Sequence, residues 1–221
     1  MKILIFDVET TGLLPKIINM ENISEYPYII QLSYILFDTE GNNIEDYFDN
    51  YIILKRKIKI PKEVTILTGI DKEKSLRGVT MITGLERLYE AMREADSVVA
   101  HNIEFDSRML FIELMRHKEY IEGNMIDRRI FDMIGIIEKR NYCTMKKGIE
   151  ICKIIAISQK GKEYYKWPKL IELHKKLFGE GVENLHDSLV DTIVCLRCCL
   201  KMKYNINMEN DIFKGLIEKL R

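Results

Sequence analysis

Two acidic residues follow a short apolar run at the start of the chain. Residues 1–6 read MKILIF, which is typical of a strand buried on both faces. Asp7 and Glu9 come next, and they share one face because strand side chains alternate. Two neighbouring carboxylates at the edge of a hydrophobic core repel each other unless a cation neutralises them or one is protonated. The pair therefore predicts a site that binds something positive.

Two other segments carry candidate ligands for the same cation. The first is H101-N-I-E-F-D106, which follows the apolar run at 97–100. Asn102 is a natural N-cap for a helix that begins there, and Asp106 would lie in the first turn or two of that helix.

The second segment is H186-D-S-L-V-D191. On one continuous helix His186 and Asp191 would point about 140° apart, because a turn takes ~3.6 residues. They can share a site only if His186 lies in the loop before the helix or in its frayed start. Residues 179–184 are rich in turn formers, so we expect such a loop there.

The elements that must position these residues can be read from the hydrophobic pattern. Helices are expected at 85–95, 105–112, 170–178, 189–200 and 208–220, and strands at 1–6, 28–38, 44–54, 97–100 and 130–133. Three strands followed by alternating helices and strands indicate an α/β domain: an antiparallel meander plus parallel strands in one mixed sheet, flanked by helices on both faces. The site would lie beyond the carboxyl ends of the strands, where Asp7 and Glu9 fall.

Length and composition set few limits on function. The 221 residues and 26.1 kDa fit a single domain, 1–221, in which 201–221 is the C-terminal helical part. The 34 basic and 34 acidic residues balance, so nucleic-acid binding would need a local patch or bound metal ions. No run approaches the ~18–20 apolar residues of a membrane span. Asp7 interrupts the N-terminal apolar run too early for a signal peptide. The odd number of five cysteines indicates reduced thiols, so we expect a cytoplasmic protein.

The three segments together resemble the motifs of the DEDDh 3′–5′ exonucleases, the proofreading-subunit-like branch of the ribonuclease H-like superfamily. F6-D-V-E-T-T-G-L13 is similar to the first motif without a break, H101-N-I-E-F-D106 to the second, and H186-D-S-L-V-D191 to the third. The similarity extends over roughly residues 1–200 and includes I30-Q-L-S33. Residues 134–167 match less clearly, and Thr68 stands where the family often has a histidine.

The resemblance implies two divalent ions, Mg²⁺ or Mn²⁺, for which oxygen ligands are suited. It assigns four metal ligands, which are Asp7, Glu9, Asp106 and Asp191. Two such ions can stabilise the attacking and the leaving oxygen of a displacement at phosphorus. His186 would be the general base, and a substrate-binding group would consist of Thr10, Thr11, Gly12 and Asn102.

The activity implied is hydrolysis of the 3′-terminal phosphodiester, which releases nucleoside 5′-monophosphates. DNA is favoured over RNA because the first motif resembles the proofreading and repair branches most, and single-stranded DNA 3′ ends are the expected partner. A polymerase or repair protein is a further candidate partner, and the oligomeric state is open. One alternative is a catalytically silent domain that binds nucleic-acid ends or a polymerase. The other is an RNA-trimming exoribonuclease.

Other conspicuous residues have simpler interpretations. His101 is expected to be structural, and Asp187 to cap the helix that carries Asp191. Cys195, Cys198 and Cys199 would lie on one helix. The nearest further ligand on that face is about 10 Å away along the helix axis, at ~1.5 Å per residue, which is too far for one zinc ion to span. Buried thiols are therefore favoured over a zinc site.

Basic and aromatic clusters leave two interpretations open. The run at 55–62 has five basic residues in eight, which fits a solvated strand edge or phosphate contacts. Lysines at 146–147 and 160–166 are similar candidates for phosphate contacts. Trp167, Tyr164 and Tyr165 could stack on bases, or Trp167 could anchor a helix in the core.

Overall fold

A five-stranded mixed sheet forms the centre of the fold, in the order β3-β2-β1-β4-β5. The computed structural model describes residues 1–182 and 186–220. The strands are β1 (Lys2–Thr10), β2 (Ile29–Asp38), β3 (Asn43–Tyr51), β4 (Ser97–Ala100) and β5 (Asn141–Cys143). Strands β1 to β3 are antiparallel neighbours, while β4 is parallel to β1 and β5 to β4. This confirms the predicted meander followed by parallel strands.

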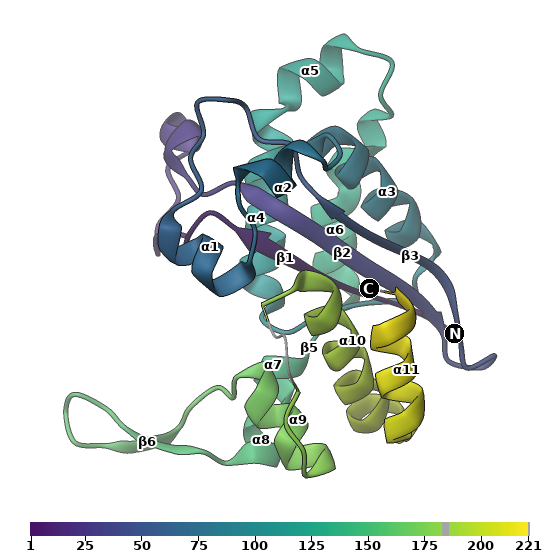
Figure 1. Ribbon diagram of the computed structural model, residues 1–221. Coiled ribbons are helices and arrows are strands. Elements are labelled where there is room, and N and C mark those ends of the chain that lie inside the picture. Colours follow the sequence, from purple (N-terminus) through teal and green to yellow (C-terminus); the bar gives the residue numbers. More distant parts are fainter. Residues whose placement is uncertain (183–185, 221) are drawn as a thin grey trace.

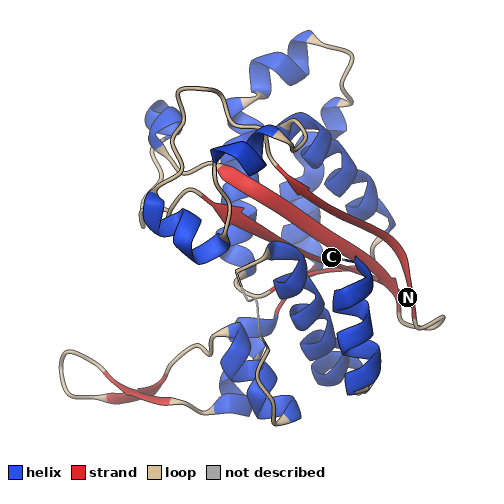
Figure 2. Ribbon diagram, viewed as in Figure 1, coloured by secondary structure: helices blue, strands red, loops and turns tan. Residues whose placement is uncertain are grey.

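Helices cover both faces of the sheet (Figure 2). Leu4, Phe6 and Val8 of β1 pack with α3 (Met81–Glu94), α4 (Ile103–Arg116) and α6 (Met133–Arg140). Ile3 and Ile5 point to the other face, where α10 (Ser188–Cys199) lies on the sheet and α9 (Leu170–Phe178) and α11 (Asn210–Leu220) pack against α10. The alternation along β1 therefore directs Asp7 and Glu9 to the α10 side.

Shorter elements join this frame. They are the 3₁₀ helices η1 (Met20–Glu25) and η2 (Arg128–Asp132), the helices α1 (Lys62–Thr68), α2 (Lys72–Leu76), α5 (Lys118–Gly123), α7 (Thr144–Lys147) and α8 (Ile149–Cys152), and the π-helical turn η3 (Leu200–Tyr204). In the predicted C-terminal helical part, 201–221, the structure has η3 and then α11, which are separated by residues 205–209.

The strand predicted at 130–133 is wrong. These residues form the end of η2 and the start of α6. Ile130 and Met133 are both buried, but their spacing of three is helical and not that of a strand. The parallel strand lies instead at Asn141–Cys143, where the first residue is exposed and only Cys143 is buried. Three residues with one buried side chain leave no hydrophobic run to detect.

A second sheet stands apart from the body of the protein. Strands β6 (Ile155–Ile157) and β7 (Glu163–Tyr165) pair with each other as an antiparallel hairpin. This hairpin projects from the region of α7 and α8, toward the same side of the molecule as α1 (Figure 1).

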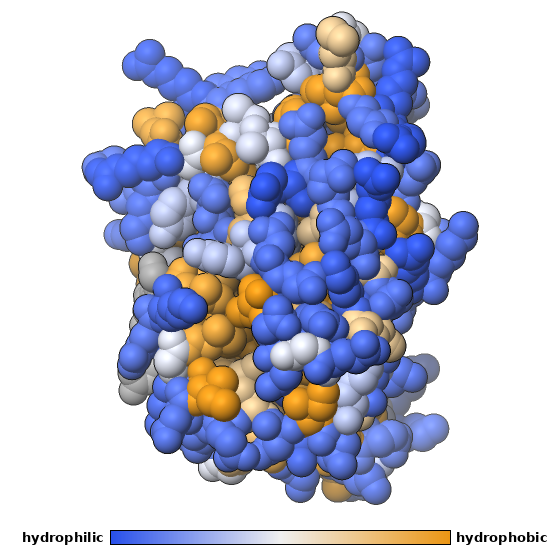
Figure 3. Space-filling view, turned by 90° about the vertical axis from the view of Figure 1, so that its right-hand side faces the viewer, coloured by the Kyte–Doolittle hydropathy of each residue, from blue (hydrophilic) through white to orange (hydrophobic). Residues whose placement is uncertain are grey.

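The opposite side of the molecule is mostly hydrophilic, with smaller apolar patches between the charged side chains (Figure 3). Among the described residues, no helix combines the length and apolar character that a bilayer span requires.

Two glycine substitutions should change stability in opposite directions. A Cβ on Gly78 would collide with the backbone carbonyl of Tyr51, where the chain crosses the end of β3. Gly78→Ala should therefore lower the free energy of unfolding by about 1–3 kcal/mol. Gly215 lies inside α11 with open space around it, so Gly215→Ala should raise that free energy by up to about 1 kcal/mol. Urea unfolding of both variants measures the difference, and a neutral Gly78→Ala would contradict the packing described.

Candidate active site

The end of β1 supplies the first two acids. Strand β4 pairs with β1 only at residues 3–5, so Asp7 and Glu9 lie beyond the end of that ladder. Both side chains are partly buried on the face that α10 covers. The apolar residues before them are fully buried, which fixes the strand and therefore the direction of the two carboxylates.

The link between β4 and α4 positions the third acid. Only His101 and Asn102 separate the strand from the helix, so Asp106 lies in the first turn of α4 and is 4% exposed. Asn102 occupies the N-cap position, as predicted, but its side chain makes no capping hydrogen bond. Its backbone is left-handed, with φ of 104°, whereas a capping side chain reaches the helix amides from an extended backbone.

The start of α10 supplies the remaining residues. The helix begins at Ser188, so His186 lies in the connecting segment before it, as predicted, with a positive φ of 73°. Asp187 caps the helix by accepting from the amides of Leu189 and Val190, which confirms its predicted role. The amide of His186 donates to Asp191 Oδ2 over 3.2 Å. The expected turn at 179–184 falls partly on residues 183–185, which lie outside the described part of the chain.

These segments converge on one place. Ligand atoms of Glu9, His186 and Asp191 all lie within 4.8 Å of one another. Asp7 and Asp106 belong to the same cluster, because the charge of Asp7 acts on Asp106 and on Asp191. Residues from positions 7, 106 and 191 of the sequence therefore meet at the carboxyl end of β1.

Burial and mutual repulsion make the negative charges unfavourable in the protein alone. Burial raises the pKa of Asp7 to about 7, although a hydrogen bond to Ser188 opposes the shift. Burial, with the charges of Asp7 and Asp191 nearby, raises the pKa of Glu9 to about 9. The same two causes raise the pKa of Asp106 and of Asp191 well above the usual range.

The donor set fits a hard divalent cation. Asp191 Oδ1 is buried and has no hydrogen-bond partner among the described residues, which is costly unless something else contacts it. Carboxylate oxygens are the ligands that Mg²⁺ and Mn²⁺ prefer, and a cation would offset the burial and the repulsion that raise the four pKa values.

A polar network that the sequence analysis did not assign supports the start of α10. Asp49 Oδ1 on β3 accepts from Gln31 Nε2 over 2.8 Å and from Ser33 Oγ over 2.7 Å. Gln31 Oε1 in turn accepts from the amide of Ser188 over 3.3 Å, and Ser188 Oγ donates to the carbonyl of Asp7 over 2.7 Å. The available signal was Gln31 and Ser33 themselves, two polar residues in the otherwise apolar strand β2.

The segment after β1 folds back on itself. Thr10 Oγ1 donates to the carbonyl of Gly12 over 2.7 Å. Thr11 and Tyr28 are joined twice, because the amide of Thr11 donates to the carbonyl of Tyr28 and the amide of Tyr28 donates to Thr11 Oγ1, each over 2.9 Å. The turn that carries the predicted substrate-binding residues is thus tied to the start of β2.

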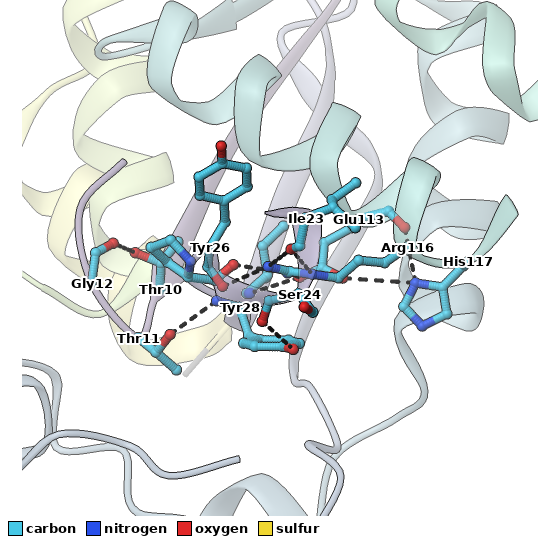
Figure 4. A network of polar contacts seen from close by, with 12 residues as sticks. Thr10, Thr11, Gly12, Ile23, Ser24, Tyr26, Tyr28, Glu113, Arg116 and His117 are labelled. Atoms are coloured by element: carbon cyan, nitrogen blue, oxygen red, sulfur yellow. Dashed lines mark hydrogen bonds and ion pairs between the residues drawn. The ribbon is translucent and has the colours of Figure 1, made fainter. Parts of the chain in front are cut away.

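Arg116, at the end of α4, fastens this segment to the helix (Figure 4). Its guanidinium donates to the carbonyls of Ile23, Tyr26 and Pro27 and lies 3.8 Å from the centre of the Tyr28 ring. Glu113 accepts from Arg116 Nη1 over 2.6 Å, and both side chains are buried. Arg116 contacts several parts of the 23–28 segment at once, and Tyr28 in this segment is bonded to Thr11. Arg116 therefore positions the Thr10–Gly12 turn indirectly, through that segment.

The other singled-out residues have clear places. His101 is structural, since Thr144 Oγ1 lies 3.0 Å from Nδ1 and the carbonyl of Pro168 lies 3.1 Å from Nε2, and burial lowers its pKa to about 4. Cys195, Cys198 and Cys199 are free and buried, as predicted. In the run at 55–62, residues 55–61 form a loop that leads into α1 and Lys62 begins that helix, so the run is not a strand edge. Trp167 is 58% exposed, so the interpretation as a core anchor is wrong: it lies in the connection after β7, where no core reaches it.

Comparison with known proteins gives a family and a fold. The family model described as an exonuclease, RNase_T, matches residues 4–198. No curated protein sequence matches. The nuclease domain of 3′hExo, described as a DEDDh family member bound to rAMP, superposes with a TM-score of 0.63 and 18% identity over 92% of both chains.

Two longer proteins contain the same fold. Escherichia coli exonuclease I in complex with a dT13 oligonucleotide has a TM-score of 0.60 and 14% identity, over 98% of this chain and 43% of that one. A 3′-exonuclease described with 3′-end specific recognition of a histone mRNA stem-loop has a TM-score of 0.59 and 20% identity, over 91% and 63%. This chain therefore spans less than half the length of exonuclease I.

The acid cluster predicts how stability depends on pH without metal. The pKa values of Asp7 and Glu9, about 7 and about 9, lie above those of the unfolded chain, so the folded state holds more protons between about pH 4 and 9. In chelator, the free energy of unfolding should therefore fall as the pH rises through this window. Added Mg²⁺ or Mn²⁺ should reverse the trend above neutral pH.

Thermal unfolding across the pH series measures this effect. Asp7→Asn should flatten the decline in chelator, whereas Asp211→Asn, at an exposed acid on α11, serves as the matched control. A profile that does not change in Asp7→Asn would show that the cluster is not the source.

Replacing Arg116 should loosen the turn without removing a charge. Arg116→Lys keeps the positive charge but loses the planar fork that reaches several carbonyls at once. The free energy of unfolding should drop by about 1–3 kcal/mol, and hydrogen exchange at the amides of Thr11 and Tyr28 should accelerate. Arg93→Lys, in a surface ion pair on α3, is the control and should change stability by less than about 0.5 kcal/mol. Unchanged exchange at both amides would contradict the positioning role.

Proposed function

Because the chain belongs to the exonuclease family RNase_T, we propose that it is a 3′–5′ exonuclease that removes nucleotides from the 3′ end of single-stranded DNA. The observation that carries this proposal is the meeting of Asp7, Glu9, Asp106, His186 and Asp191 at the end of β1. A domain that only binds nucleic acid has no need to hold four carboxylates against their mutual repulsion.

Asp7, Glu9, Asp106 and Asp191 would hold two divalent cations, Mg²⁺ or Mn²⁺, in keeping with the divalent-metal dependence of the DEDDh exonucleases. When bound, such cations supply positive charge to the attacking and leaving oxygens at phosphorus. The contribution of the protein is geometry. Buried strand β1, the first turn of α4 and the first turn of α10 hold the carboxylates in place before any ligand arrives.

His186 would act as the general base. Its position before α10 puts its ring within 4.8 Å of carboxylate oxygens of Glu9 and Asp191, and its amide is bonded to Asp191. Imidazole is well suited to take a proton near neutral pH. Water attacks the terminal phosphorus, its proton passes to His186, and the bond to the 3′ oxygen of the preceding nucleotide breaks. The product is a nucleoside 5′-monophosphate, and the freed 3′ oxygen takes a proton from solvent.

The turn after β1 would contact the terminal nucleotide. The side chains of Thr10 and Thr11, the amide of Thr11 and the carbonyl of Gly12 take part in internal hydrogen bonds, so the remaining backbone groups of this turn, such as the amide of Gly12, would contact the substrate. A Cβ at Gly12 would meet only Pro27 Cγ, at 3.8 Å, so the space beside Gly12 is open. Asn102, whose side chain does not cap α4, would add a polar group at the start of the helix that carries Asp106.

The choice of DNA rests on the first motif, F6-D-V-E-T-T-G-L13, which is most similar to proofreading and repair enzymes. RNA is the second candidate, because two of the similar structures are described with rAMP and with a histone mRNA stem-loop. A polymerase or repair protein would be a natural partner of a DNA-trimming enzyme.

A time course on a 5′-labelled single-stranded oligonucleotide tests the proposal. With Mg²⁺ or Mn²⁺ the products should form a ladder that shortens one nucleotide at a time from the 3′ end, and chelator should stop it. The same experiment on RNA of matched sequence decides the substrate. A folded protein that cuts neither strand with either ion would instead be a binding domain.

Substitution of His186 tests the assigned base. His186→Asn should lower kcat by about 10²–10⁴-fold while metal still raises the unfolding temperature. Asp191→Asn should lower both activity and stabilisation by metal, with Asp211→Asn as the control. Full activity of His186→Asn at neutral pH would mean that another group takes the proton.

A further inference from the structure

The β6–β7 hairpin and the residues that flank it, 153–169, form an arm that the chemistry at the end of β1 does not use. The arm leaves the body after α8 and returns at α9. Its strands pair only with each other, with Ile155 opposite Tyr165 and Ala156 opposite Tyr164. Both faces of such a ribbon meet solvent, and a lone two-stranded hairpin is at best marginally stable in water.

The arm is anchored at its base and free beyond it. The carbonyl of Pro168 accepts from His101 Nε2 over 3.1 Å, because a carbonyl can only accept. Lys166 Nζ donates to Glu172 Oε1 of α9 over 2.7 Å. His101 directly precedes Asn102 and the helix that carries Asp106, so the base of the arm is bonded to the edge of the acid cluster.

Large apolar and aromatic side chains are exposed along the arm. Ile155 and Ile157 are 60% and 70% exposed, and about half of the surface of each aromatic side chain is exposed, at Tyr164, Tyr165 and Trp167. Ile155 and Tyr165 share one face of the ribbon, while Tyr164 points to the other. Exposed aromatic rings on a protruding ribbon lose the burial that usually stabilises them, so a partner with flat apolar faces would restore it.

The excess of lysines on the arm favours a negatively charged partner. Residues 153–169 contain five lysines, at 153, 160, 162, 166 and 169, and one acid, Glu163. The whole chain has equal numbers of basic and acidic residues, so this is a local excess. Lys160 and Lys162 lie at the exposed tip between the strands. A single-stranded nucleic acid supplies phosphates for the lysines and base faces for the aromatic rings.

We propose that this arm holds the single strand on the 5′ side of the terminal nucleotide. The inference rests on the proposed function, because a 3′ end in the acid cluster leaves only the 5′ part of the strand to extend outward. In Figure 1 the end of β1, α1 and the arm lie toward the same side of the molecule. The proposed path takes a strand that leaves the end of β1 past the arm. The arm thereby distinguishes long strands from dinucleotides.

Binding in chelator tests the arm separately from cleavage. The probe is a 20-nucleotide single-stranded DNA with a 5′ fluorophore, followed by anisotropy at several salt concentrations. Tyr164→Ser with Tyr165→Ser should weaken binding roughly tenfold or more, from the loss of two stacking positions. Lys160→Ser with Lys162→Ser should reduce the slope of log affinity against log salt by about 1.4, two phosphate contacts at about 0.7 each. Tyr120→Ser with Lys118→Ser on α5 is the matched control, since both side chains are exposed there.

Cleavage with Mg²⁺ gives a second measurement. In the arm variants, kcat/KM for the 20-nucleotide strand should fall relative to kcat/KM for a dinucleotide, mainly through KM. A variant with wild-type affinity and an unchanged salt slope would overturn the proposal. So would a wild-type dimer that the arm variants convert to monomers while strand affinity is kept, which would make the arm a contact between copies.

The two proposals can fail separately. If the wild type binds the strand through the arm but cuts no substrate, the arm stands and the exonuclease assignment falls. If the wild type produces the ladder while every arm variant binds and cuts equally well, the exonuclease assignment stands and the arm has no part in binding.

Discussion

The repulsion among carboxylates at the end of β1 is the constraint on which the rest of the structure depends. Asp7 and Glu9 cannot move apart, because buried strand β1 fixes their direction, and α4 and α10 add Asp106 and Asp191 to the same place. Burial makes each charge costlier, and the raised pKa values express that cost. The arrangement is favourable only when positive charge is present, so the apo protein is less stable near and above neutral pH than it would be with those acids replaced.

Polar contacts add to the apolar packing of the elements around the cluster. Ser188 bonds to the carbonyl of Asp7 and to Gln31, which brings the start of α10 onto β1 and β2. Arg116 fastens the segment before β2 to the end of α4. Hydrogen bonds have directional geometry and apolar contacts do not, so these bonds can fix positions to the fraction of an ångström that catalysis requires.

The residues proposed for chemistry and those proposed for strand binding lie in different parts of the chain. The acids lie at the carboxyl edge of the central sheet on elements that the core fixes, and exposed His186 is held beside them by the bond from its amide to Asp191. The arm at 153–169 carries lysines and exposed aromatic rings outside that core and is attached through Pro168 to His101, at the start of the helix that carries Asp106. Under the two proposals, the residues at the end of β1 would cut the phosphodiester and the arm would determine how firmly a long strand is held.

The sequence by itself determined the β1 acids, the three motifs, most of the longer helices to within a few residues and the order of the first four strands along the chain, because each depends on local alternation, capping or a hydrophobic run. It predicted His186 in the loop before α10 from helical spacing together with the turn formers at 179–184. Only the tertiary structure decided what joins those pieces. The Gln31–Asp49 network and the Arg116 contacts link residues far apart in the chain, and a polar residue in sequence does not reveal its partner. The short strand β5 and the β6–β7 hairpin were not predicted either. Strand β5 has only one buried residue, and neither face of the hairpin packs on the core, so neither has a hydrophobic pattern to detect. Whether such segments form strands depends on their neighbours in space, and the periodicity along the chain contains no information about those neighbours.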